Sequence, residues 1–238
     1  MSRNGARLLL SILGIAAIAL LFVIGARNSR SQNPKEAQAL DENAQLVDAL
    51  RRGGIREAAR IKGNYVITKR TSWDAVFSDT EALTSHSRSV ILAMPTESSS
   101  RVSPAGDTIL TDYKVNVLDV LKGKVQPGGS LIVTSIGGFV RFEDGTSAEV
   151  KTPDIHIQNG RTYVFFLSAK AKTESENLYI TGGPQGIFEL SDDGVTILAM
   201  GRQIDHVVKK NKGKRTDTFL KEIRLAAEKW PGEGKCCQ

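Results

Sequence analysis

The sequence predicts a mainly β fold, either a sandwich or a closed barrel, with helices at both ends. Residues Thr108–Gly123 alternate in polarity with the period of two of a half-buried strand, and this phase slips between Val117 and Leu118. A strand keeps its apolar residues on one face across such a slip by inserting one extra residue, a β-bulge, which bends it. Short apolar runs separated by tight turns fill the rest of the chain as far as Met200. Bent strands and evenly spaced turns are typical of small barrels and sandwiches.

An apolar run dominates residues 1–27. Leu8 to Ala26 carries no charge, lies between Arg7 and Arg27, and is close to the ~20 residues that a helix needs to cross a bilayer. A cleaved signal peptide is the alternative, because Arg3 and Arg7 precede the run. The run is longer than the ~7–15 residues of a signal-peptide core, and Ile24-Gly25-Ala26 is a poor cleavage site. We therefore expect an uncleaved membrane anchor with the C-terminal domain exported, periplasmic or extracellular; a cleaved segment would give a secreted protein.

Residues 28–63 are predicted to be a short polar linker and a helical segment. Asn33-Pro34-Lys35-Glu36 has the residues of a helix start, and apolar residues then recur at helical spacing as far as Gly53-Gly54. A second short helical turn follows, up to Gly63. We expect this amphipathic segment to pack on the barrel as a stalk or lid; a helix that binds a partner or dimerises is the alternative.

The β domain is predicted over residues 64–200. Ser78–Glu81 has the pattern of a capping box at the start of a short helix, and the Ser-, Pro- and Gly-rich residues 97–107 are expected to form a mobile loop. Hairpins are predicted where two-residue turns separate apolar runs. These turns are Asp144-Gly145, Asn159-Gly160 and Asp193-Gly194, and the other predicted strands are Tyr65–Thr68, Val90–Met94, Leu131–Ile136 and Leu178–Thr181.

Most of the net charge of +6 lies in residues 201–238, whereas residues 27–201 together carry a net charge of −1. A basic loop is predicted from Lys209 to Arg215, followed by an amphipathic helix from Asp217 with Phe219, Ile223, Ala226 and Trp230 on one face. The loop is a candidate contact for an anionic surface, because clustered lysines near a membrane attract acidic headgroups or polymers. The residues concerned are Lys209, Lys210, Lys212, Lys214 and Arg215. A solvated linker is the alternative.

No motif for catalysis, metal binding or cofactor binding stands out. Asp154 and His156 lie two residues apart, without a nucleophile motif beside them. They define an enzyme alternative, a weak hydrolase, which would require a serine in a pocket with His156. His86 and His206 lack a second ligand at metal spacing. The only cysteines, Cys236 and Cys237, are adjacent near the C-terminus, so they cannot stabilise the core.

Three stretches carry a family resemblance. They are SHSRSVILAMP (Ser85–Pro95), VLDVLKG (Val117–Gly123), and NGRTYVFFLS (Asn159–Ser168) followed by GGPQGIFEL (Gly182–Leu190). Together they resemble a family of uncharacterised exported or membrane-anchored bacterial proteins with a small OB-like β-barrel. Ala93 and Met94 stand where that family usually has glycine. The barrel is also similar to the netrin-like modules of metalloproteinase inhibitors, whose N-terminal cysteine has no counterpart before Cys236.

The resemblance implies a closed or partly open OB-like barrel and supplies no catalytic residues. The predicted function is therefore a membrane-tethered, non-catalytic binding or interaction module of the cell envelope. We expect the bilayer to hold residues 8–26, a protein or an envelope polymer to be the partner, and no cofactor. The alternatives are the hydrolase with His156 and Asp154, and binding of an anionic polymer or nucleic acid through Lys209–Arg215. Nucleic acid is not favoured, because the barrel lacks an excess of positive charge.

Overall fold

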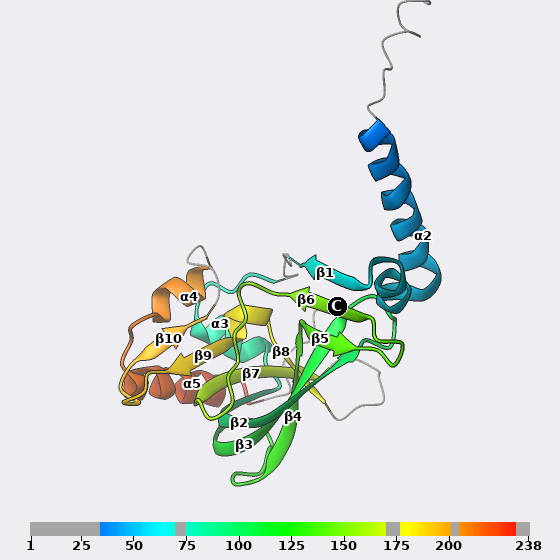
Figure 1. Cartoon of the computed structure of the whole chain (residues 1–238). Coiled ribbons are helices and arrows are strands. Elements are labelled where there is room, and N and C mark those ends of the chain that lie inside the picture. The colour runs from blue at the N-terminus through cyan, green and yellow to red at the C-terminus, as the bar shows by residue number, and fades with distance from the viewer. Residues whose placement is uncertain (1–33, 70–74, 170–176, 201–204, 232–238) are drawn as a thin grey trace, which may run out of the picture. The chain divides into compact units, whose positions relative to one another are not determined.

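The computed structural model describes residues 34–69, 75–169, 177–200 and 205–231 (Figure 1). The chain divides into two compact units, Met1–Asp48 and Ala49–Gln238, and the strands that the structure describes lie in the second. The predicted anchor and the two cysteines lie outside the described residues. None of the helices in the described ranges has the length and apolar character needed to span a membrane.

Helix α2 (Pro34–Lys62) begins at the predicted proline and is broken at Gly54, where φ is 65° and ψ is −152°. The predicted division into two helical pieces at Gly53-Gly54 is thus confirmed. After the break, Ile55, Ala58 and Ala59 are buried. Ala49, before the break, is buried as well. Apolar residues are thus buried on both sides of Gly54.

Five strands close into a barrel, which decides between the two predicted architectures. The strands are β2 (Ser89–Val102), β3 (Ile109–Lys122), β4 (Ser130–Ile136), β7 (Tyr163–Ala169) and β8 (Leu178–Ile180). Around the ring the order is β7-β2-β3-β4-β8, and β8 closes it by pairing with β7. The β4–β8 pair is parallel and the other four pairs are antiparallel.

The predicted bulge in β3 is present. Leu92 pairs with Asp119 and the next residue, Ala93, pairs with Val117, so Leu118 is the extra residue. Its predicted position on the inner face is wrong, because the Leu118 side chain is 50% exposed. The bulge directs Leu118 outward, and this keeps Val117 and Val120 packed on the barrel interior.

The expected mobile loop over residues 97–107 is wrong. β2 continues to Val102 and pairs with β3 throughout, so the serine-rich stretch is strand. Two hydrogen bonds hold the remaining turn, residues 103–108. The Ser103 hydroxyl donates to Asp107 Oδ1 over 2.7 Å, and the Ile55 amide donates to the Gly106 carbonyl over 2.8 Å. Sequence composition predicted mobility there, but cross-strand pairing and the helix that follows Gly54 decide otherwise.

Two further strand sets complete the fold. β9 (Ile187–Leu190) pairs with β7, and β10 (Ile197–Ala199) pairs with β9 through the predicted Asp193-Gly194 turn. The 3-10 turn η1 (Gly183–Gly186) precedes β9. A separate three-stranded sheet has the order β1-β6-β5, where β1 is Asn64–Thr68, β5 is Gly138–Arg141 and β6 is Ser147–Lys151. It contains the predicted Asp144-Gly145 hairpin and the predicted strand Tyr65–Thr68.

The hairpin predicted at Asn159-Gly160 is wrong, because residues 152–162 contain no strand. Ile155 and Ile157 instead pack against the apolar interior of the barrel. The Gly160 amide donates to the Pro95 carbonyl over 2.8 Å, which holds this segment to β2. The apolar alternation of Ile155 and Ile157 thus reflects packing at one end of the barrel, without a partner strand.

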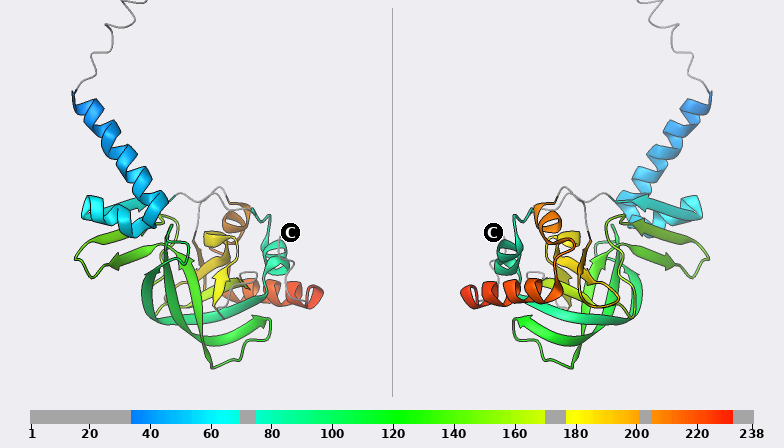
Figure 2. Two further views of the ribbon diagram at one scale, coloured as in Figure 1. Left: turned by 90° about the vertical axis from the view of Figure 1, so that its right-hand side faces the viewer. Right: turned by 90° about the vertical axis from the view of Figure 1, so that its left-hand side faces the viewer.

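Helices α3 (Thr80–His86), α4 (His206–Asn211) and α5 (Thr216–Lys229) lie together on one side of the barrel (Figure 2). Asp79 caps α3, one residue later than the start of the predicted capping box. Phe219, Ile223 and Ala226 of α5 are buried as predicted, whereas Trp230 at the helix end is 46% exposed. Phe219 and Ile223 pack on Val90, Val164, Phe166 and Phe188, which forms a second core outside the barrel.

Candidate functional site

The outer face of β3, with its neighbours on β2, β4 and β8, is mainly polar and partly solvent-accessible; we call it the open face. Its members follow from the strand register, in which Ser99 and Thr134 lie on either side of Asp112, and Tyr179 lies beside Thr134. Lys114, two residues after Asp112 and on the same face of β3, is exposed. The polar side chains of this face are Glu97, Ser99, Arg101, Asp112, Lys114, Asn116, Ser130, Thr134 and Tyr179. Thr134 is buried, at 1% exposed, and the apolar Ile132 lies opposite Lys114.

A hydrogen-bonded chain crosses the strands of the open face. Arg101 Nε donates to Asp112 Oδ2 over 2.6 Å, and Arg101 Nη2 donates to Asp112 Oδ1 over 3.3 Å. The Thr134 hydroxyl also donates to Asp112 Oδ1, over 2.6 Å, and Asn177 Nδ2 donates to the Thr134 hydroxyl over 3.3 Å. This chain links polar side chains from β2, β3 and β4 to one another, so that they are ordered before any ligand arrives.

The charges on the open face are paired. The hydrogen bond to Asp112 raises the pKa of Arg101, so its guanidinium stays charged beside the carboxylate. Lys114 Nζ lies 3.2 Å from Glu97 Oε1. The face therefore offers donors and acceptors without an excess of either sign. Such a surface suits a ligand rich in hydroxyl or amide groups better than a polyanion.

A hollow of about 510 Å³ lies between one end of the barrel and the small sheet. Tyr113, Ile155, His156 and Glu149 are among the residues that line it. No serine or cysteine and no Asp154 is among its lining residues, so the arrangement required for the predicted hydrolase is not met there. Asp154 and His156 both lie in the irregular segment after β6, not on a strand.

Burial raises the pKa of Tyr113, so its hydroxyl keeps its proton at neutral pH. The pKa of Tyr163, inside the barrel, is also raised by burial, and its hydroxyl accepts a hydrogen bond from the Gln158 amide over 3.0 Å.

The predicted basic loop is not a loop. Lys209 and Lys210 belong to α4, and the other three residues form the connection to α5. Lys214 Nζ donates to Asn211 Oδ1 and to Glu222 Oε2, each over 2.7 Å. Arg215 pairs with Asp217 at 2.9 Å, and this pair lowers the pKa of Asp217 to about 2. Local carboxylates thus neutralise two of the five charges.

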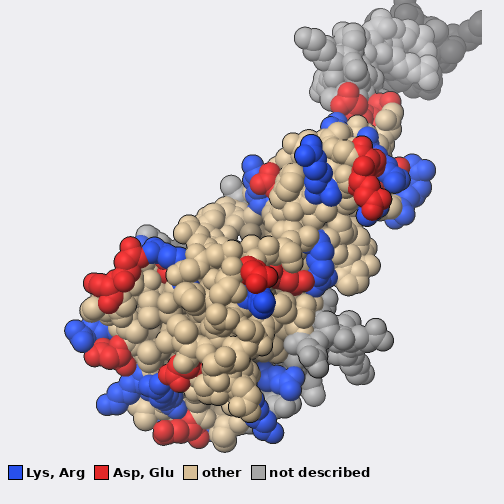
Figure 3. Space-filling view, turned by 60° about the horizontal axis from the view of Figure 1, so that its bottom comes forward, with Lys and Arg blue, Asp and Glu red and all other residues tan. Residues whose placement is uncertain are grey.

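Lys209, Lys210 and Lys212 are exposed. Positive and negative side chains are interspersed over the face of the molecule drawn in Figure 3. The three exposed lysines and the mixed charges of that face do not amount to the continuous basic surface that nucleic-acid binding requires.

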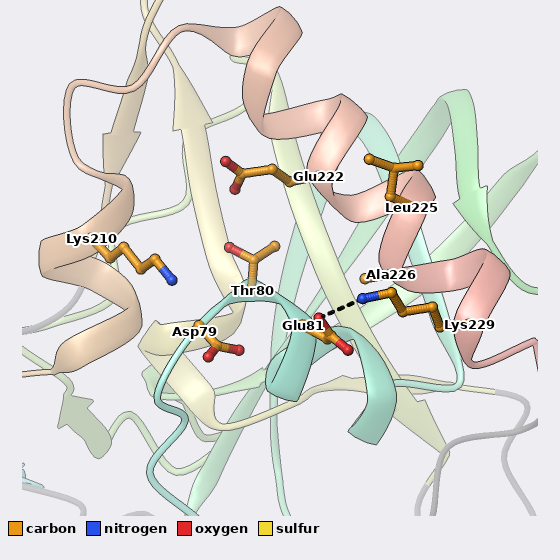
Figure 4. A pocket seen from close by; sticks show the side chains of 8 residues that line it. All are labelled: Asp79, Thr80, Glu81, Lys210, Glu222, Leu225, Ala226 and Lys229. Carbon is orange, nitrogen blue, oxygen red and sulfur yellow. Dashed lines mark hydrogen bonds and ion pairs between the residues drawn. The ribbon is translucent and has the colours of Figure 1, made fainter.

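A second hollow, of about 270 Å³, lies between α3, α4 and α5 (Figure 4). Its carboxylates are already engaged. Asp79 Oδ1 accepts the Ala82 amide at 2.8 Å, which lowers the pKa of Asp79, and Glu81 pairs with Lys229 at 3.1 Å. Within the described ranges, no cluster of His, Cys, Asp or Glu has the arrangement of a metal site. We interpret this hollow as part of the helix packing.

Two residues of the resemblance motifs are structural. Gln185, from the "Q-G-x-F" stretch, is buried; its Oε1 accepts the Phe77 amide at 3.0 Å and its Nε2 donates to the Ala75 carbonyl over 3.1 Å. Lys122, from "V-L-K-G", is 5% exposed, and its Nζ donates to the carbonyls of Thr84 and Ser87 over 2.7 and 2.8 Å. These carbonyls lie at the C-terminal end of α3, so Lys122 joins the barrel to that helix.

We expect Lys122→Met to lower the free energy of unfolding by about 1–3 kcal/mol at neutral pH, because two buried carbonyls lose their donor. The difference should also depend on pH. Burial lowers the pKa of Lys122 below its usual 10.5 in the folded protein. Between the folded value and 10.5 the unfolded chain binds more protons, so the wild type gains stability as the pH rises, and the variant does not.

Urea unfolding of both proteins from neutral into alkaline pH measures this difference. The buried tyrosines titrate in both proteins, and their effect cancels in the comparison. A difference that is flat or shrinks with rising pH contradicts the assignment.

Comparison with known proteins finds no family model that matches the chain and no curated protein with significant sequence similarity. Only the fold and the site therefore indicate the class of this protein. It is a closed β-barrel protein with an ordered polar outer face. Sequence reasoning missed this face. The expected loop over residues 97–107 includes Ser99 and Arg101. Simple alternation from Ile91 does not find this face either, because the register of β2 against β3 shifts between Pro95 and Glu97 and turns Ser99 and Arg101 outward.

Proposed function

We propose that this protein is a membrane-tethered, non-catalytic module that binds a neutral polymer of the cell envelope on the open face. The observation that carries the proposal is the hydrogen-bonded chain from Arg101 through Asp112 to Thr134 and Asn177. An ordered polar surface with paired charges, on which Ser99, Lys114 and Asn116 are exposed, is complementary to an extended chain of hydroxyl and amide groups. The apolar interior of the barrel, filled by residues such as Val115, Val133 and Phe165, is packed and offers no comparable polar lining.

The order in which the five barrel strands are connected supports an OB-like barrel. Numbered along the chain, the barrel strands follow the ring order first, second, third, fifth, fourth, with the third and fifth parallel. This is the connectivity of OB folds, which bind oligosaccharides and oligonucleotides on their second and third strands. Those strands correspond to β3 and β4, which carry Asp112 and Thr134. The resemblance to exported OB-like proteins in the "V-L-K-G" and "Q-G-x-F" stretches is in keeping with this assignment.

The tether is part of the proposal and rests on the sequence of residues 8–26. A membrane anchor would hold the open face at a high effective concentration near the envelope, so that weak contacts suffice for binding. Protease treatment of intact cells, with and without membrane disruption, tests this part. We expect the C-terminal domain to be cleaved only where the protease reaches the exported side.

Lys114→Trp should weaken binding to a neutral glycan about tenfold or more, because the indole ring occupies the middle of the open face. Lys114 is exposed and its ion pair with Glu97 is a surface pair, so the fold should be retained. The assay is co-sedimentation of the full-length protein, in detergent, with insoluble chitin or glucan at low and high salt. Leu198→Trp, at a 42% exposed position on β10, is the matched control and should bind as the wild type does.

Binding should change little with salt, because the charges of the open face are paired. A steep loss with salt would favour Lys209–Arg215 and an anionic polymer in place of this proposal. Wild-type binding that Lys114→Trp leaves intact would remove the open face as the site.

A further inference from the structure

β1 has an uncovered edge. In the small sheet it pairs with β6 on one side, and the described residues place no strand on its other side. β10, at the end of the large sheet, is by contrast covered by backbone bonds to Gly213 and Lys214. The β1 sequence NYVIT carries no charge, no proline and no bulge, and Val66 and Ile67 are 45% and 37% exposed. Charged residues, prolines and bulges prevent an edge strand from pairing with another chain, and an edge that lacks them is a template for such pairing.

The backbone of β1 has a defined outward set. The Gly63 carbonyl accepts the Ser147 amide and the Lys69 amide donates to the Lys151 carbonyl, so residues 63 and 69 point toward β6. In a strand, the N–H and C=O of one residue point the same way and alternate residues point oppositely. The amides and carbonyls of Asn64, Val66 and Thr68 are therefore directed away from β6, to the uncovered side.

This outward set is complementary to itself. If two copies of β1 lie antiparallel about a two-fold axis at Val66, each Val66 faces its equivalent, and Asn64 faces Thr68. The residues that meet are then the outward-pointing ones, which can exchange both backbone hydrogen bonds in each pair. Tyr65 meets Ile67, an aromatic and β-branched pair of the kind that stabilises sheets, and no like charges meet within the strand.

We infer that β1 is a dimerisation edge, and that two copies of this chain join their three-stranded sheets through antiparallel β1–β1 pairing centred on Val66. The interface is isologous, as in most homodimers. It is small, so the dimer is weak in solution and is favoured where chains are concentrated. The inference does not depend on the proposed ligand of the open face.

The test uses the full-length protein in detergent, with Cys236 and Cys237 replaced by serine. Val66→Cys should give a disulfide-linked dimer on mild oxidation, because facing residues of a hydrogen-bonded pair lie about 5.5 Å apart between Cα atoms. Asn64→Cys and Thr68→Cys should each fail to cross-link alone, since equivalent copies are about 13 Å apart. Mixed together, these two variants should cross-link to each other.

Sedimentation across a concentration series measures the dimer itself. Val66→Lys should weaken dimerisation about tenfold or more, because two lysines face each other at the two-fold axis. Phe139→Lys is the matched control: Phe139 is 54% exposed on the same face, and both residues lie opposite Glu149, but Phe139 belongs to β5. It should leave the dimer unchanged.

A chain that stays monomeric over the whole series overturns the inference. So does a dimer that persists in Val66→Lys, which would place the contact in the N-terminal segment or elsewhere. Cross-linking of Thr68→Cys to itself at the same yield as Val66→Cys would also overturn the proposed register.

Discussion

Phe219→Ala should lower the free energy of unfolding by about 3–5 kcal/mol, the largest effect that we expect from a single side chain. Phe219 is fully buried, and its ring centroid lies 4.8 Å from that of Phe188 and 6.5 Å from that of Phe166. Truncation removes the aromatic contacts through which α5 packs on β7 and β9, and it leaves a cavity between helix and sheet. Equilibrium unfolding in urea measures the loss.

Leu225→Ala is the control on the same helix. Leu225 is 49% exposed, so this substitution should change stability by no more than about 0.5 kcal/mol. If Phe219→Ala cost under about 1 kcal/mol, α5 would not be held by the core that the structure describes.

Gly54→Ala should cost more than about 2 kcal/mol, for two independent reasons. The φ of 65° and ψ of −152° lie in a region that is essentially restricted to glycine, at a cost of about 1–3 kcal/mol for other residues. In addition, a Cβ at this position would overlap the backbone carbonyl of Gly106, which cannot rotate away as a side chain would. The Ile55 amide donates to that same carbonyl, so the substitution should also release residues 55–62 from the turn at 103–108.

Gly63→Ala is the control for a positive φ without the backbone overlap. Gly63 has a φ of 70°, close to that of Gly54, but a Cβ there would meet no atom within 4 Å. It should cost about 1 kcal/mol, from the backbone conformation alone. Hydrogen exchange at Ile55, together with urea unfolding, measures both variants. Equal losses for Gly54→Ala and Gly63→Ala would show that the approach to Gly106 has no energetic consequence.

Much of the secondary structure could be predicted because its causes are local. Pro34 starts α2 and Gly54 breaks it, and Asp144-Gly145 and Asp193-Gly194 make hairpins, as their intrinsic conformations require. The hairpin predicted at Asn159-Gly160 does not form, although Asn-Gly is as strong a turn signal as Asp-Gly. Ile155 and Ile157 gain more by packing on the end of the barrel than by pairing with β7, whose neighbours are β2, β8 and β9.

The candidate site was less predictable than the fold. The open face depends on Arg101, Asp112 and Thr134 lying side by side, although they are far apart along the chain. Their sequence neighbourhood gives no sign of this, because register between strands is set by the whole sheet. The basic surface predicted over Lys209–Arg215 is not continuous, because nearby carboxylates neutralise part of it. Lys214 pairs with Glu222 and Arg215 pairs with Asp217, both carboxylates of α5. Adjacent lysines and arginines in the sequence do not reveal these pairs.

By itself, the sequence determined a mainly β chain with a bulged central strand, glycine-marked turns and an amphipathic C-terminal helix. Backbone preference and hydrophobic period act over a few residues and can be evaluated without a fold. Only the tertiary structure decided that β8 closes the sheet into a barrel, that β1 leaves it for a second sheet, and that polar side chains meet on β3. These outcomes depend on which distant strands pair, and pairing is a competition among all the strands for burial and hydrogen bonds.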